Sequence, residues 1–494
     1  MSLFRTKSIE ASIADSTEEG RSLKRSIGTW DLMLMGIAVA VGAGIFSVGA
    51  RAAGDFAGPS VILSFLLAAV TCGLAIMCYA EFASAVPVAG SAYTFTYATM
   101  GELLAWIIGW DLILEMLTGA AVIAKYWGIY LSDVFEIAGL GVPDTISVLG
   151  LQVSWGAFLI VAIFTTLLVL GTKLSSRVGS IFTVLKVAVV LFVIVVGAFF
   201  IRVENYTPFV PPSQPTEGGA ADVWGQSLFA WATGAAPAQY GVFGLLAGAS
   251  LVFFAFIGFD VVATSAEEVK NPQRTIPRGI FAGLAVVTVL YVLVTLVLTG
   301  MVPYTFLADA EDPSLATAFV EVGASWAAQV ISLGILLGLT TVIMVLLLGL
   351  ARVVFAMSRD GLLPRVLSRT SERHKTPARI QILAGVIVAL IAGLTDVGVL
   401  EEMINIGTLS AFVLVSVGIV VLRRNRPDIH AAFRVPFSPW LPLLSAALCV
   451  WLMLNLTTLT WVRFLVWLAI GFAIYFLYGR RHSMLATSSR ALDA

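Results

Sequence analysis

Residues 30–53 read WDLMLMGIAVAVGAGIFSVGARAA, an apolar stretch that is interrupted by the glycines of VGAGIF at 41–46. A helix of about 20 apolar residues is long enough to cross the roughly 30 Å hydrocarbon core of a bilayer. The interruption would leave backbone N–H and C=O groups without partners, so it must be buried in protein or line a watery cavity. A similar interruption, FAFIGFD at 254–260, falls in a second apolar stretch. We therefore expect an all-α membrane protein in which two helices are broken.

The composition of the whole chain favours the same class. The 494 residues are 59% hydrophobic and 12% charged, with a mean hydropathy of +0.96, whereas roughly a quarter of the residues of a soluble domain are charged. Runs such as VAVVLFVIVVGAFFI (187–201) are apolar on every face, which favours helices over the alternating strands of a barrel. Cys72, Cys78 and Cys449 fall in apolar stretches, so we expect them to pack rather than to form disulfides.

Twelve membrane spans are predicted from the apolar stretches. They lie at 30–53, 58–82, 102–136, 153–173, 178–201, 241–268, 279–301, 326–357, 378–396, 403–422, 440–458 and 461–479. The broken spans are the first and the sixth, so two halves of five spans begin alike, which is typical of an inverted repeat with its site at the breaks. The predicted organisation is a cytoplasmic segment (1–29), a first repeat (30–201), an external loop (202–240), a second repeat (241–422), two further spans (423–480) and a cytoplasmic tail (481–494).

Positive charge is placed unevenly among the connecting segments. Most of the 29 Lys and Arg fall before the first span and in every second loop, while the intervening loops and the span ends beside them hold only Arg51, Arg202 and Arg463. By the positive-inside rule, both termini are expected in the cytoplasm of a cell whose plasma membrane holds the protein. The loops 202–240 and 302–325, which would face outward, are rich in Gly, Pro or acidic residues and are predicted to be connectors.

The breaks predict the chemistry of a ligand. The second half of the first span would begin near Gly44 and Ile45, where free N–H groups and the positive end of a helix dipole suit a carboxylate. The halves that end near Ala40 and Phe254 would present carbonyl groups that suit an ammonium group. A single zwitterion satisfies both, so an α-amino acid is the expected ligand, and a bulky residue at Gly44 should block it. Phe254 could either pack in the core or cover the ligand as a gate.

Few ionisable residues fall inside the predicted spans, and each is a functional candidate. They are Asp111, Glu115, Lys125, Lys186 and Asp260. Lys186 lies deep in the fifth span, and because burial favours the neutral form of a lysine, it could gain and lose a proton during transport. Asp260 could cap the half-helix that follows the second break or take part in proton transfer, and structural pairing explains Asp111, Glu115 and Lys125 equally well. His374, His430 and His482 fall in cytoplasmic segments, so no imidazole relay is expected.

Ordered motifs along the chain resemble those of a known transporter group. They are RTKSIE (5–10), LKRSIGTWDLMLMGIAVAVGAGIF (23–46), YAEFASAVPVAGSAYTFTY (79–97), GWDLILE (109–115), FFAFIGFDVVATSAEEVKNPQRTIPRGI (253–280) and AMSRDGLLP (356–364). The chain resembles the amino acid–polyamine–organocation superfamily, and within it the bacterial relatives of the cationic amino acid transporters. The resemblance covers most of the chain through the tenth span.

The resemblance implies the five-plus-five inverted repeat of the leucine-transporter type and a set of site residues. The substrate-binding residues it implies are Ala40, Gly42, Ala43, Gly44, Phe254 and Ile257, with Phe254 as the aromatic gate. The neighbouring residues Ile45 and Ala255 complete the expected binding set. The resemblance also implies Lys186 as the proton-coupling residue, in the place of the sodium ion of sodium-coupled relatives. From the residues themselves, Glu115 and Asp260 are the next candidates for coupling, and the hydroxyls of Thr340 and Thr341 are expected to bind the Lys186 ammonium group. Ala43 departs from the pattern because many relatives carry Ser or Thr there, so a hydroxyl contact is missing.

Three classes of function are open to such a chain: a transporter, a membrane-embedded enzyme, and a channel or scaffold. The chain has no HExxH or GxxxxGK[ST] motif and no histidine inside a span, which disfavours an enzyme. We predict a proton symporter that imports small or neutral L-amino acids, with a cationic amino-acid uniporter or an amino-acid/polyamine exchanger as the alternative. The expected partners are the amino acid, protons and the lipid bilayer. No cofactor, metal or nucleic acid is predicted, and a homo-oligomer or a small accessory membrane protein stays open.

Overall fold

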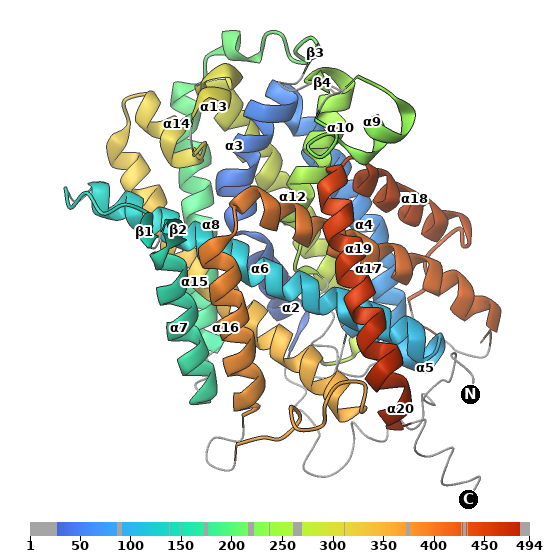
Figure 1. The fold of residues 1–494 in the computed structure, drawn as a ribbon. Coiled ribbons are helices and arrows are strands. Elements are labelled where there is room, and N and C mark those ends of the chain that lie inside the picture. The colour runs from blue at the N-terminus through green and yellow to red at the C-terminus, as the bar shows by residue number, and fades with distance from the viewer. Residues whose placement is uncertain are drawn as a thin grey trace, which may run out of the picture.

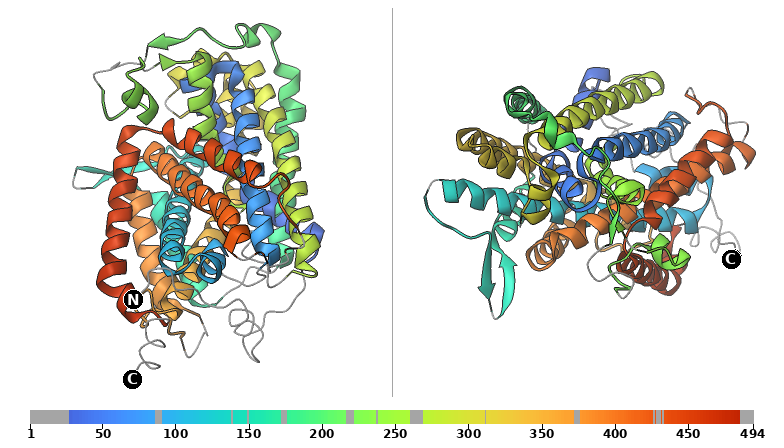
Figure 2. Two further views of the ribbon diagram at one scale, coloured as in Figure 1. Left: turned by 90° about the vertical axis from the view of Figure 1, so that its right-hand side faces the viewer. Right: turned by 90° about the horizontal axis from the view of Figure 1, so that it is seen from above.

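The structure is a computed structural model of the whole chain. The described residues are 27–85, 91–137, 139–148, 150–171, 176–215, 222–236, 238–259, 269–310, 312–371, 376–425, 427, 431 and 433–484. Helices dominate these residues and form one bundle, which is seen from three directions in Figures 1 and 2. Within the described part, seven helical stretches are long and apolar enough to cross a membrane, and five apolar helices are shorter.

The first half of the chain begins with an interrupted helix. Its pieces are α2 (Thr29–Ala40), the π-helix η1 (Gly44–Val48), α3 (Gly49–Ala52), the π-helix η2 (Ala53–Ala57) and the 3-10 helix η3 (Gly58–Ser60). There follow α4 (Val61–Ala85), α5 (Ser91–Thr99), α6 (Glu102–Ile137), the antiparallel strands β1 (Thr145–Val148) and β2 (Leu151–Ser154), α7 (Trp155–Val169), α8 (Ser176–Gly197) and η4 (Ala198–Phe200).

The second half begins with a folded loop and another interrupted helix. The loop holds η5 (Val203–Tyr206), β3 (Gln214–Pro215), α9 (Leu228–Thr233) and β4 (Ala238–Gln239), and the helix is α10 (Gly241–Val252) with η7 (Phe253–Phe256). There follow α12 (Pro272–Met301), α13 (Tyr304–Asp309), α14 (Leu315–Glu321), α15 (Ser325–Arg359), α16 (Ala378–Leu394), α17 (Val397–Asn425), α18 (Trp440–Leu454), α19 (Thr458–Ile474), η9 (Tyr475–Gly479) and α20 (Arg480–His482).

Helices lie at the positions of the predicted spans, with differences at their ends. The helix α12 begins at Pro272, seven residues before the predicted seventh span. The helix α17 begins at Val397, six residues before the predicted span, so two glutamates that were assigned to a loop lie in its first turns. The predicted connectors are partly helical, with α9, α13 and α14 at one end of the bundle. The short helix α5 was not predicted. The part of the sixth span at 260–268 lies outside the described residues.

The long helices α6 and α15 cross at the centre of the bundle, and α17 packs on α6. Peripheral helices are apolar on both sides because one side meets protein and the other would meet lipid. On α8, for example, Val190 and Val193 are buried while Leu191 and Val195 are exposed. A membrane supplies the apolar surroundings that such a face requires. Cys72, Cys78 and Cys449 are free and buried.

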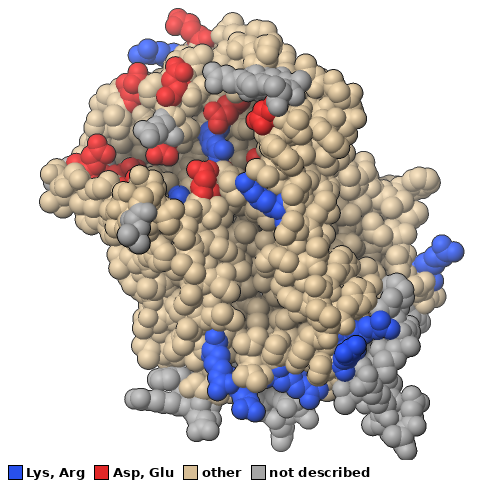
Figure 3. Space-filling model, viewed as in Figure 1, with Lys and Arg blue, Asp and Glu red and all other residues tan. Residues whose placement is uncertain are grey.

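Charge is segregated between the two ends of the bundle. One end carries α9, α13, α14 and the β3–β4 pair, and we refer to it as the loop face; the other carries α20 and the start of α2 and is the terminal face (Figure 1). On the side shown in Figure 3, Asp and Glu gather near the loop face, while most Lys and Arg lie near the terminal face. This separation agrees with the charge asymmetry of the sequence.

Candidate functional site

The first break separates α2 from η1, at Val41–Ala43. The final hydrogen bond of α2 runs from Val41 N–H to Ile37 O at 2.9 Å, and Val41 then leaves helical geometry. Two carbonyl groups near the end of α2 are satisfied by side chains from other helices. Lys186 Nζ donates to Ala38 O at 2.7 Å, and Tyr291 Oη donates to Ala40 O at 2.5 Å. In the half-helix that follows, the first N–H groups lack an intrahelical carbonyl partner, as they do at the start of any helix.

The second break follows η7, where Ile257 is extended and Gly258 has a φ of +110°. Gly258 needs to be glycine because this backbone conformation disfavours side chains. Four carbonyl groups around the break accept hydrogen bonds from outside the helix. Asn405 Nδ2 donates to Ser250 O at 3.0 Å and to Leu251 O at 3.3 Å, Tyr291 Oη lies 2.7 Å from Ala255 O, and Cys72 Sγ lies 3.8 Å from Phe256 O.

The two breaks are in direct contact. A Cβ atom at Gly44 would lie 2.5 Å from Ala255 Cα, which is too close for any side chain. The structure therefore brings together the two sets of predicted substrate-binding residues and leaves each of them buried: Ala40, Gly42, Ala43, Gly44 and Ile45 at the first break, and Phe254, Ala255 and Ile257 at the second. A bulky residue at Gly44 would thus strike the backbone of Ala255, so it would disturb packing as well as a ligand.

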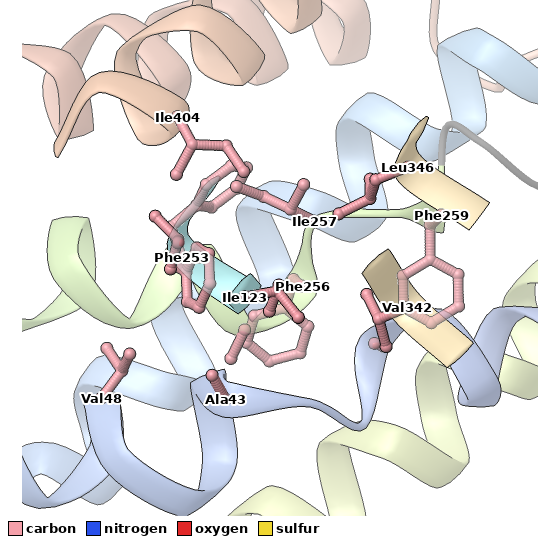
Figure 4. Close-up of a cluster of buried hydrophobic side chains, with 14 of the residues drawn as sticks. Ala43, Val48, Ile123, Phe253, Phe256, Ile257, Phe259, Val342, Leu346 and Ile404 are labelled. Atoms are coloured by element: carbon pink, nitrogen blue, oxygen red, sulfur yellow. The ribbon is translucent and has the colours of Figure 1, made fainter. Parts of the chain in front are cut away.

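Apolar side chains surround the breaks on the side of α6, α15 and α17 (Figure 4). Those labelled in the figure include Ile123 of α6, Val342 and Leu346 of α15, Ile404 of α17, and Phe253, Phe256, Ile257 and Phe259 beside the second break. All are buried. We call this set the apolar cluster. A ligand held by the backbone at the breaks would place its side chain against hydrocarbon rather than against charge.

Lys186 links three helices. Its side chain is 1% exposed, its ammonium group binds Ala38 O of α2, and its methylene groups lie on Gly338 of α15, where a Cβ would meet Cγ at 2.9 Å. The hydroxyls that were expected to join it are engaged elsewhere among the described residues. Thr340 accepts from Trp127 Nε1 at 3.1 Å, and Thr341 donates to Gly338 O at 3.0 Å.

Of the other predicted ionisable residues, Asp111, Glu115 and Lys125 lie on α6, and Asp260 lies outside the described residues. Asp111 is buried and accepts from Ser410 Oγ at 2.5 Å, and Glu115, one turn further along α6, is also buried. Lys125 Nζ donates to Thr395 O at 2.6 Å, at the carboxyl end of α16. His482 lies in α20 on the terminal face, while Asp260, His374 and His430 lie outside the described residues. Within the described part, no three His, Cys, Asp or Glu side chains are grouped to hold a metal ion.

An ion pair that was not predicted closes the bundle on the loop face. The Arg51 guanidinium of α3 contacts the Glu401 carboxylate of α17, and Tyr126 of α6 donates to the same carboxylate at 2.5 Å. Glu401 is fully buried. Sequence reasoning missed the pair because Arg51 was counted as a loop residue and Glu401 lay before the predicted tenth span. An acidic residue that borders an apolar stretch was the available signal.

A cavity of about 310 Å³ opens beside this ion pair. Its walls include Ser47, one turn after Gly44, and Tyr130, whose hydroxyl lies 2.8 Å from Ser47 Oγ. Its acidic lining consists of Asp55, Asp133, Asp312 and Asp396. The cavity thus extends to Ser47, close to the first break, and Arg51 and Tyr126 of the ion-paired group form part of its wall.

A second ion pair, with a buried carboxylate, lies toward the terminal face. Arg423 of α17 binds Glu81 of α4 through two hydrogen bonds of 2.8 and 2.7 Å, and Val435 N–H donates to the same carboxylate at 2.7 Å. Two parallel N–H···O bonds give such a pair geometric specificity as well as strength. The breaks are therefore enclosed between two ion-paired layers.

Comparison with known proteins decides the family. A model of the amino acid permease family matches residues 27–478. The chain belongs to the amino acid permease family. Within the amino acid–polyamine–organocation superfamily, this permease is related to the cationic amino acid transporters. It is 43% identical to the branched-chain amino acid permease BcaP and 40% identical to the methylthioribose transporter, both of Bacillus subtilis, over 98% of this chain and 99% of each relative. It is 30% identical to human cationic amino acid transporter 4, over 95% of this chain and 89% of the relative.

Proposed function

We propose that this permease imports neutral L-amino acids with small or apolar side chains and couples their entry to protons through Lys186. Helix N–H groups after the first break would receive the carboxylate, and carbonyls at the two breaks would receive the ammonium group. The amino-acid side chain would then lie in the apolar cluster, whose Ile123, Leu346 and Ile404 favour a hydrocarbon chain. The name of the branched-chain relative supports a ligand of this class.

The observation that carries the coupling proposal is the position of the Lys186 ammonium group. It donates to a carbonyl of the broken first span, while the methylene groups of Lys186 pack on Gly338 of α15. The protonated side chain therefore joins α2, α8 and α15. A neutral amine would bind the Ala38 carbonyl less strongly, since hydrogen bonds from charged groups are roughly twice as strong as neutral ones. Loss of the proton would therefore loosen the first break and favour opening. A proton would then be carried with each cycle.

The test is uptake by the purified protein in liposomes. With only an inward proton gradient imposed, the wild type should concentrate labelled leucine, and Lys186→Ala should not. Any exchange that remains in Lys186→Ala should be insensitive to pH. Lys125→Ala is the matched control, because it also removes an intramembrane ammonium group that donates to a carbonyl, yet at the end of α16. If Lys186→Ala still concentrates leucine, the coupling role is wrong.

A second candidate function is exchange or uniport of cationic amino acids. The acidic lining of the loop-face cavity favours it, because Asp55, Asp133 and Asp396 would raise the local concentration of cations. The same liposomes decide between the two, with labelled leucine, alanine and arginine supplied in separate counterflow experiments. Arginine counterflow that exceeds leucine counterflow, and that persists without a proton gradient, would support the second function and contradict the first.

A further inference from the structure

A tyrosine that belongs to neither break contacts both of them. Tyr291 lies on α12 and is fully buried. Its hydroxyl lies 2.5 Å from Ala40 O, at the end of the helix before the first break, and 2.7 Å from Ala255 O, just before the second. These carbonyls are more than 200 positions apart in the chain. A single phenol therefore holds the two interruptions together.

The hydroxyl leaves both carbonyls able to bind a further donor. A phenol carries one proton, so it donates fully to one carbonyl at a time or shares the proton between them. Each carbonyl oxygen has two lone pairs, and the tyrosine can occupy only one on each. Two oxygens that are held around one point, each with a lone pair to spare, form an acceptor cluster for a group with several N–H donors. The α-ammonium group of an amino acid is such a group.

Aromatic contacts hold the ring of Tyr291, and these contacts do not require its hydroxyl. The ring makes edge contacts with Phe65 of α4, at 5.6 Å between ring centroids, and with Phe256 of η7, at 5.2 Å. Phenylalanine could make the same ring contacts. A polar atom without a hydrogen-bond partner is unfavourable inside a membrane protein. The polar atom is directed at the two carbonyls.

We propose that Tyr291 is a positioning residue for amino-acid binding, which orients the Ala40 and Ala255 carbonyls to accept the ammonium group of the substrate. The inference rests on the proposed function, since it concerns the same site. Without the hydroxyl, two buried carbonyls with partial negative charge would face each other and move apart. Substrate would then have to bring them back together, so binding would weaken while later steps kept their rates.

The test compares Tyr291→Phe with Tyr206→Phe. The control removes a phenol hydroxyl that also binds α12, at Leu296 O with a distance of 2.7 Å, at the loop end of that helix rather than at a break. In leucine counterflow, Tyr291→Phe should raise KM by about tenfold or more and leave the maximal rate within about twofold of wild type. Tyr206→Phe should change neither. A lower maximal rate with an unchanged KM would show a merely structural role and overturn the inference.

Hydrogen–deuterium exchange provides a readout that does not depend on transport. In Tyr291→Phe, residues 38–46 and 250–258 should both exchange faster than in wild type, while Tyr206→Phe should leave both segments unchanged. Unchanged exchange together with an unchanged KM overturns the inference and leaves the permease function intact. If the wild type takes up neither leucine, alanine nor arginine, the proposed function and the binding part of this inference are overturned. Hydrogen–deuterium exchange would then still test whether the Tyr291 hydroxyl links the two breaks.

Discussion

The two glycines of the first break have different surroundings, although they are two residues apart. A Cβ at Gly44 would lie 2.5 Å from Ala255 Cα and Cβ, whereas one at Gly42 would meet Val39 O, Ile123 and Leu339 at 3.8–3.9 Å, which is ordinary van der Waals contact. Of these two glycines, Gly44 is the one that brings the backbone of the first break against the backbone of the second. Sequence reasoning singled out Gly44 as the start of the second half-helix, but it could not show that Ala255 lies against it.

Gly44→Ala is therefore expected to destabilise the protein by about 1–3 kcal/mol, the usual cost of an extra methyl group in a tight contact. Gly42→Ala should change the unfolding free energy by less than about 1 kcal/mol, because its methyl group fits the available space. Thermal unfolding in detergent, with and without leucine, measures both. Equal stability of the two variants would show that the breaks do not touch in this way.

At the scale of elements, the helix α17 contacts the loop-face ion pair, the second break and the apolar cluster. It supplies Glu401 to the loop-face ion pair, Asn405 to the carbonyls before the second break and Ile404 to the apolar cluster. The next residue after Glu401, Glu402, is engaged differently: it accepts hydrogen bonds from the hydroxyls of Thr457 and Thr460 near the start of α19. Adjacent glutamates on one helix thus connect it to different neighbours.

We expect Glu401→Gln to open the loop face. The variant keeps the shape of the side chain but leaves Arg51 with only Asp55, at 3.5 Å, as an ionic partner among the described residues. A cysteine at Ser47, which is buried and lines the cavity beside the ion pair, should then react with a maleimide about tenfold faster or more, since tenfold corresponds to about 1.4 kcal/mol. Glu402→Gln in the same background should react at the original rate. Equal rates for both variants would exclude the ion pair as the closing contact.

Much of the element order was predictable, because hydrocarbon allows only helices to span it and the apolar runs mark where they lie. The start of α17 was not predictable in this way, since its first turns carry Glu401 and Glu402. The breaks could be recognised from their glycines, yet the groups that satisfy their carbonyls could not. Tyr291 and Asn405 come from helices distant in the chain, and nothing local in the sequence pairs them with residues 40 and 250.

For the whole molecule, the segregation of charge predicts its orientation in the membrane. Glu204 on the loop face and Thr370, in the segment between α15 and α16, are exposed, and the three native cysteines are buried. In intact cells, a membrane-impermeant maleimide should label Glu204→Cys and should label Thr370→Cys only after permeabilisation. Background labelling should be low because Cys72, Cys78 and Cys449 are shielded. The reverse pattern would place the loop face in the cytoplasm.

The helix α17 carries one ion pair near each of its ends, with Glu401 toward the loop face and Arg423 toward the terminal face. It is continuous between them, and Ser410 ties its middle to Asp111 of α6. A stiff rod that is held at its middle behaves as a lever about a fulcrum. Tilting α17 about this contact would move both of its ends, so a change at the loop-face pair would be transmitted to the terminal-face pair. The stiffness of a single helix would thereby couple the two faces of the bundle.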